Sequence, residues 1–163
     1  MYEIHAELAQ KYKSGANWFY WIAGLSLITS IITFSGGSWR FLISLGTTQV
    51  IDGIAAALSA EVGGSAPQFI ALVLDVFLTA IFVLFGVFAN KKLLWAYILG
   101  MAAFVVDGLV SLVIQDFVSV IAHVVVLIFM VPGFLAGRKM VELEQAMAAQ
   151  AAAQAQAPAG TSI

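Results

Sequence analysis

Apolar residues along the chain gather in long runs that only a few polar residues interrupt. Three such runs follow one another closely, at 68–89, 93–114 and 117–136, and a fourth lies upstream at 16–34. Each run is about 20 residues long, the length that a helix needs to cross about 30 Å of hydrocarbon. The last three runs are joined by so few residues that we expect their helices to lie side by side and antiparallel.

The stretch 39–60 has a different pattern. It is apolar enough to be buried, but Ser44, Thr48 and Asp52 share one side of a helical wheel while apolar residues cluster on the other. This two-sided pattern favours a re-entrant or interfacial helix over a lipid-facing span. The alternative is that 39–60 crosses the bilayer, which would give the protein five spans.

Basic residues distinguish the two topologies through the positive-inside rule. If 39–60 does not cross, six Lys and Arg residues share one face and Arg40 lies on the other, whereas crossing splits them two against five. The first division gathers more of the basic residues on one face. It also places the Trp and Tyr residues at the ends of the first and third spans on that face. We therefore predict an all-α integral membrane protein: a four-transmembrane-helix bundle with an additional outer re-entrant or interfacial helix and both termini cytoplasmic.

The two ends of the chain flank this membrane domain, 16–137. In 1–15, apolar residues recur near every fourth position and acidic residues precede lysines, as the helix dipole favours. We expect an amphipathic helix on the cytoplasmic membrane surface. Residues 138–163 begin with helix formers, so we expect the last span to continue for a few turns into a flexible Ala/Gln-rich tail. Pro132 is a candidate for a kink in that helix.

Composition supports a membrane location. The chain has 163 residues, of which 62% are hydrophobic and 10% charged, whereas soluble domains are about 25% charged. Its seven Lys and Arg residues are scattered and its formal net charge is -2, so nucleic acid is not an expected partner. We expect contact with the lipid bilayer, in the plasma (inner) membrane of a bacterial cell.

Three ionisable residues lie inside the four predicted spans: Asp75, Asp107 and His123. Such residues are costly in a membrane and are candidates for function. Each lies six or seven residues from the same end of its span, or about 10 Å below the outer surface at 1.5 Å per residue. Asp52, on the polar side of 39–60, can reach the same depth. The sequence therefore predicts one intramembrane polar layer of Asp52, Asp75, Asp107 and His123.

This layer has several interpretations. It can be a structural cluster in which an aspartate hydrogen-bonds His123 and the hydroxyls of Thr79 or Ser111. It can be a proton or cation path, since chains of Asp and His act as relays. His123 can instead be an axial ligand of haem or a chlorophyll-type pigment, although no second intramembrane histidine is present. A metal-dependent hydrolase is a further alternative, but no catalytic or metal-binding motif supports an enzyme.

Small residues four positions apart, at 96–100 and 133–137, allow close helix packing within the chain or against a partner. The plan resembles that of small bacterial multi-pass membrane proteins. With minimal loops and no catalytic motif, the leading expectation is a non-catalytic accessory or scaffold subunit, which binds other membrane subunits or further copies of itself. The alternatives are a small transporter or channel that uses the Asp/His layer, and a haem- or pigment-binding subunit.

Overall fold

The computed structural model describes residues 2–37 and 45–156, and these residues are helical apart from short turns. The helices are α1 (Tyr2–Ala16), α2 (Trp18–Phe34), α3 (Gly46–Val62), α4 (Ala66–Asn90), α5 (Leu94–Val113) and α6 (Phe117–Gln156). Within these residues four helical segments are long and apolar enough to cross a membrane: α1–α2 together, α4, α5 and α6. The predicted all-α membrane class with four spanning helices is confirmed.

The observed spans begin and end close to the predicted apolar runs. Helix α5, for example, begins and ends one residue inside the run 93–114. Helix α4 begins two residues before its run, at Ala66, and has Pro67 in its first turn. Proline is well placed there because the first amides of a helix have no partner within the helix. The bounds of these helices could therefore be predicted closely from the apolar runs.

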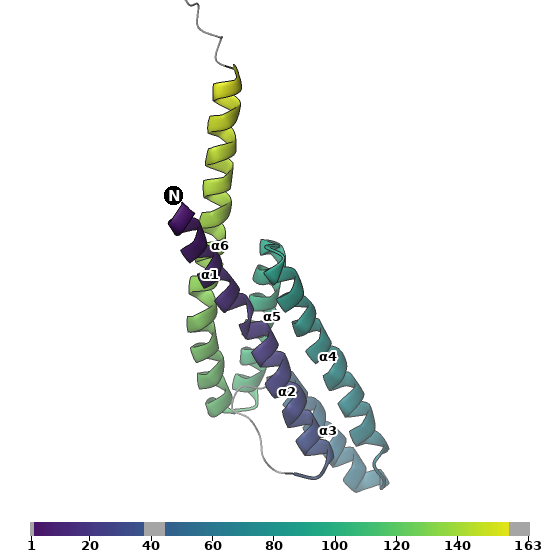
Figure 1. Ribbon diagram of the computed structural model, residues 1–163. Coiled ribbons are helices and arrows are strands. Elements are labelled where there is room, and N and C mark those ends of the chain that lie inside the picture. The colour runs from purple at the N-terminus through teal and green to yellow at the C-terminus, as the bar shows by residue number, and fades with distance from the viewer. Residues whose placement is uncertain (1, 38–44, 157–163) are drawn as a thin grey trace, which may run out of the picture.

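Helix α3 contains 17 residues and does not cross the bundle. Figure 1 shows that α3 returns to the end of the bundle at which α2 ends and α4 begins. We call this end the α3 end, and the opposite end, where α4 turns into α5, the α1 end. This arrangement agrees with the predicted re-entrant helix, except that α3 begins at Gly46 and ends at Val62. Residues 38–44, which include Arg40 and Ser44, lie outside the described residues.

Helix α1 differs in position from the expected surface helix. Only Asn17 separates it from α2, and it packs along α6 instead of lying apart. The two helices approach closely at glycines: a Cβ atom on Gly133 would lie 2.8 Å from the Cα atom of Gly15. The small residues at 133–137 therefore serve packing within the chain.

Aromatic side chains fill the middle of the bundle. Phe19 from α2 lies against Tyr97 from α5 with ring centroids 5.6 Å apart, and Phe82 from α4 lies 6.3 Å from Phe104. A Cβ atom on Gly100 would meet the Phe19 ring at 2.5 Å, so the glycine makes room for it. The outer faces of the helices keep large apolar residues exposed, as contact with lipid requires.

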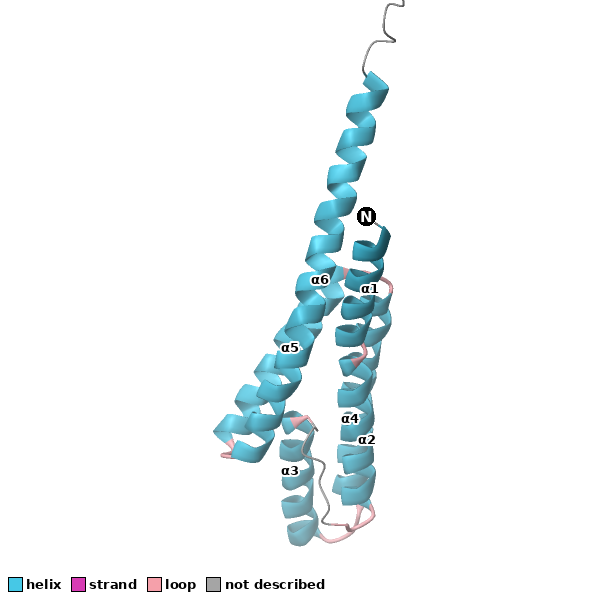
Figure 2. Ribbon diagram, turned by 60° about the vertical axis from the view of Figure 1, so that its left-hand side comes forward, coloured by secondary structure: helices cyan, strands magenta, loops and turns pink. Residues whose placement is uncertain are grey.

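Helix α6 is 40 residues long and continues through Pro132. Beyond the bundle it projects away from the other helices (Figure 2), and residues 144–155 are all exposed. The helix therefore extends further than the few turns expected, through the Ala/Gln-rich segment to Gln156. The rest of the predicted tail lies outside the described residues.

Candidate functional site

Asp107 and His123 form a buried ion pair between α5 and α6. The Asp107 Oδ2 atom lies 2.9 Å from His123 Nε2. Their exposed fractions are 4% and 3%, respectively. The His123 ring also stacks on Phe104, with centroids 4.4 Å apart. Two of the ionisable residues that the sequence placed at one depth are therefore in direct contact.

Asp107 also anchors the first residues of α3. Its Oδ2 atom accepts a hydrogen bond from the Gly46 amide at 2.7 Å, and Oδ1 accepts from the Thr47 amide at 2.9 Å and the Thr47 hydroxyl at 2.6 Å. The preceding amide, of Leu45, donates to Ser26 Oγ at 2.8 Å. The first amides of a helix need such partners, and the positive end of the helix dipole favours a carboxylate. These contacts explain how α3 can begin inside the bundle (Figure 2).

Hydrogen bonding defines the protonation of the pair. His123 Nδ1 lies 2.7 Å from the carbonyl oxygen of Ser119, which can only accept, so Nδ1 carries a proton. The remaining proton lies between His123 Nε2 and Asp107. Because Asp107 also accepts three bonds from α3, the ionised carboxylate with a protonated imidazole suits this geometry. Both ring nitrogens of His123 therefore have hydrogen-bond partners within the bundle.

Asp75 is the most unusual polar residue of the bundle. Its side chain is fully buried, with 0% exposed, and neither carboxylate oxygen has a hydrogen-bond partner among the described residues. Ser30 from α2 and Asp52 from α3 are the polar side chains that face it. The Ser30 and Thr79 hydroxyls are also buried without a partner in the described chain. Four oxygen-bearing side chains from three helices thus lie in this region, where the oxygens of Asp75 are unsatisfied.

A line of further polar atoms leads from Asp75 toward the α3 end. Ser59 follows Asp52 by two helical turns, and Gln68 precedes Asp75 by seven residues, or about 10 Å along the helix. The Ser59 hydroxyl and the Gln68 Oε1 atom are both buried and have no partner in the described chain. In the opposite direction, Phe82 and the other aromatic rings follow Thr79. Buried polar atoms therefore lie toward one end of the bundle from Asp75, and aromatic packing lies toward the other.

The four residues expected in one layer thus fall into two pairs, Asp107–His123 and Asp52–Asp75. Helix α3 connects them: it is anchored at Gly46 by the first pair and carries Asp52 six residues later, about 9 Å further along. Of the hydroxyls expected to join the layer, Ser111 donates to the Asp107 carbonyl at 3.3 Å. Within the described residues, no group of three or more His, Asp or Glu side chains is arranged to hold a metal.

Four contributors were not singled out by the sequence: Ser26, Ser30, Thr47 and Ser119. The sequence does contain a signal for Ser26 and Ser30: they lie four residues apart in an uncharged span and so share a helix face. Single hydroxyl residues are common in spans, however, because they can bond to their own helix, as Thr29 does to Leu25. Their role became evident only from their neighbours.

Comparison of the chain with protein-family models, with curated proteins and with solved structures finds no match.

Proposed function

We propose that the protein binds a proton or a monovalent cation at the Asp52–Asp75 pair and carries it across the membrane as a small transporter. The observation that supports this most directly is Asp75, which is buried with both carboxylate oxygens unsatisfied. A membrane-embedded carboxylate without a hydrogen-bond or charge partner is strongly unfavourable. A bound proton or cation removes that cost.

The neighbours of Asp75 support the same proposal. Two carboxylates that face each other repel when both are ionised, so the pair holds a proton or a cation more readily than a single carboxylate. The hydroxyls of Ser30 and Thr79 add neutral oxygen atoms, the ligands that hard cations prefer. Helix α3 begins inside the bundle, as do the broken helices beside many ion sites of transporters.

The polar line past Ser59 and Gln68 gives the proposed cation a route from the α3 end. Aromatic packing around Phe82 closes the other direction. Access from one end at a time is a requirement of alternating access, so we propose that transport needs a movement that loosens this aromatic packing.

Charge supports an orientation for the route. All six Lys and Arg residues within the described ranges lie at the α1 end, and the positive-inside rule places such an end in the cytoplasm. In this proposal both termini are cytoplasmic, the α3 end faces the outside, and the membrane is the bacterial inner membrane.

Flux measurements in proteoliposomes test the proposal. Wild-type protein should move H⁺, Na⁺ or K⁺ down an imposed gradient, and Asp75→Asn should abolish that flux because the amide cannot exchange a proton or bind the cation as an ion. Asp116→Asn is the matched control. It makes the same chemical change at the α5–α6 turn, where Asp116 accepts from the Ser119 amide at 3.1 Å. No flux of any of the three ions in the wild type, or undiminished flux in Asp75→Asn, would refute transport at this site.

A second candidate function is that of an accessory or scaffold subunit in a larger membrane complex. The projecting part of α6 favours it, because residues 145–155 are exposed and extend away from the other helices (Figure 2). An isolated helix of this length is marginal in water, so a partner would stabilise it. Native mass spectrometry of protein extracted from its own membrane should then detect a bound partner, and truncation after Glu144 should release it. A partner-free wild-type protein would argue against this role.

A further inference from the structure

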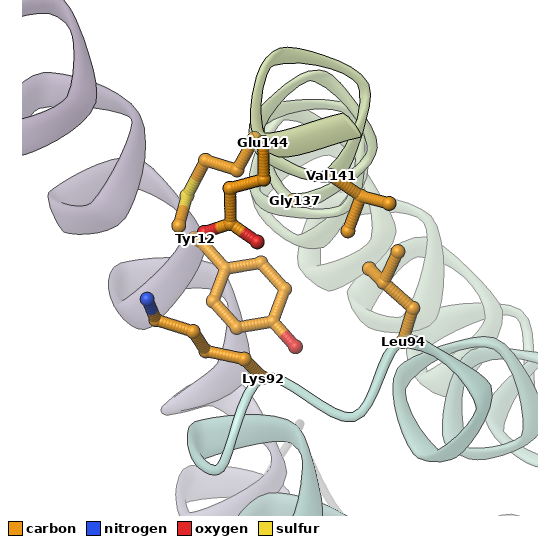
Figure 3. Close-up of a pocket in the computed structure, with 7 residues that line it drawn as sticks. Tyr12, Lys92, Leu94, Gly137, Val141 and Glu144 are labelled. Atoms are coloured by element: carbon orange, nitrogen blue, oxygen red, sulfur yellow. The ribbon is translucent and has the colours of Figure 1, made fainter. Parts of the chain in front are cut away.

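A cleft of about 300 Å³ lies at the α1 end, far from the acidic pairs. It is lined by Ala9, Tyr12, Lys13, Asn90, Lys92 and Met140. A smaller cavity of about 50 Å³ adjoins it and shares Tyr12, Lys92 and Met140. Figure 3 shows this smaller cavity, with the Tyr12 ring between Lys92 on the α4–α5 turn and Glu144 on α6.

The lysines of this cleft have no acidic partner in the described part of the chain, unlike two other basic residues at the same end. Lys11 pairs with Glu7 at 2.7 Å, and Arg138 pairs with Glu142 at 3.7 Å. Lys13 and Lys92 form no ion pair with any described residue. The cleft is thus lined by two cations whose charge the protein leaves uncompensated.

The remaining polar groups of the cleft are already engaged. The Tyr12 hydroxyl donates to the Ala89 carbonyl at 2.8 Å, and the Asn90 amide donates to the Gly86 carbonyl at 2.9 Å. The two lysine ammonium groups are therefore the main free donors, with three N–H groups each. Ala9 and Met140 supply apolar surface beside them. This combination suits a ligand with an anionic head and an apolar body.

The position of the cleft indicates the source of such a ligand. Helix α4 ends at Asn90, and Lys92 lies in the short turn before α5, two residues ahead of Leu94. The cleft therefore lies where two spans reach the surface of the bilayer, at the depth of lipid headgroups. Lys92 has a φ angle of 63°, which is unfavourable for a residue other than glycine. Glycine is the usual residue in this conformation at the end of a helix, so the lysine at this position carries a conformational cost.

We infer that the cleft between α1 and the α4–α5 turn binds the phosphate headgroup of an anionic phospholipid through Lys13 and Lys92. The phosphate accepts from both ammonium groups, and the glycerol and the first carbons of the acyl chains lie against the apolar wall. Basic pockets between spans are known to hold anionic headgroups in this way. Glu144 faces the adjoining cavity and weakens the attraction without cancelling it.

Native mass spectrometry of the full-length chain in mild detergent tests the inference. Phosphatidylglycerol is titrated against zwitterionic phosphatidylcholine of the same chains, and the wild type should prefer phosphatidylglycerol by about 10-fold or more. Lys13→Gln with Lys92→Gln should lower phosphatidylglycerol affinity by about 30-fold, which is about 2 kcal/mol at 1.4 kcal/mol per tenfold. Glu144→Gln should raise the affinity, because it removes the opposing charge.

The matched control is Lys91→Gln with Lys139→Gln. It removes the same net charge at the same end of the protein but changes no residue that lines either cavity. Its phosphatidylglycerol affinity should fall less than about threefold, since the lysines of the cleft remain. Equal losses in the two double variants would overturn the inference and indicate a general surface attraction. Equal binding of the two lipids would overturn it as well. Binding of inorganic phosphate at the affinity of phosphatidylglycerol would refute the lipid assignment in favour of a soluble phosphate compound.

Discussion

Replacing Asp107 by alanine removes the side chain that anchors α3 inside the membrane. Asp107 accepts four hydrogen bonds, three from Gly46 and Thr47 and one from His123. Alanine leaves the buried Gly46 amide and the partly buried Thr47 amide without acceptors, and it leaves the imidazole of His123 without its partner. We expect α3 to lose its fixed position at this end and the whole bundle to lose stability.

The magnitude follows from the number and kind of these contacts. Hydrogen bonds between helices in a membrane contribute about 0.6 kcal/mol on average, so the four bonds amount to about 2.4 kcal/mol. Removing one partner of a buried ion pair costs about 3–5 kcal/mol, because the other charge remains buried. We therefore expect Asp107→Ala to lower the free energy of unfolding by about 3 kcal/mol.

Unfolding in mixed micelles with increasing SDS, followed by circular dichroism, measures this change. Asp116→Ala is the control, because Asp116 accepts a single bond, from the Ser119 amide at 3.1 Å. Loss of such a cap costs about 1 kcal/mol. Hydrogen exchange provides a local measurement: the amides of Gly46 and Thr47 should lose protection in Asp107→Ala, while those of α4 keep theirs. The anchoring of α3 through Asp107 would be refuted if Asp107→Ala lowered the free energy of unfolding no more than Asp116→Ala and the α3 amides stayed protected from hydrogen exchange.

A double-mutant cycle separates the pair from the cap. Asp107→Ala and His123→Ala should be coupled by about 1–3 kcal/mol, since each side chain is the other's partner. Two independent effects would show that His123 contributes through its contact with Phe104 and not through the ion pair.

Three further predictions concern other parts of the bundle. Asp75→Leu should raise the free energy of unfolding by about 1–3 kcal/mol in the SDS assay while it abolishes flux, because it removes a buried unsatisfied carboxyl; a loss of stability would show that Asp75 has a structural partner. Gly133→Val should cost about 1–3 kcal/mol, because a Cβ atom there would lie 2.8 Å from the backbone of α1, whereas Gly24→Val, with open space at its Cβ, should cost little. Because the chain has no cysteine, single cysteines at Ser65 and Lys92 should react with impermeant reagents from opposite sides of the membrane; labelling from one side would contradict the four-span bundle.

The sequence by itself determined the spans. The thickness of the bilayer sets how many consecutive apolar residues a spanning helix needs, and that length can be counted without knowing any neighbour. The polar face of 39–60 similarly showed that this stretch is a poor lipid-facing span, and α3 does not cross. Asp75, Asp107 and His123 could be singled out because an ionisable residue in hydrocarbon is unfavourable in any fold.

Only the tertiary structure decided how these residues are paired. Counting residues along a helix gives the depth of a side chain, but it gives neither the rotation of the helix nor its neighbours. The four residues at similar predicted depths therefore separated into two pairs once the first turn of α3 docked on Asp107. The same limit applies to α1, because one amphipathic pattern suits a membrane surface and a groove on α6 equally. The close approach of Gly15 and Gly133 distinguishes them, and this contact joins residues more than one hundred positions apart.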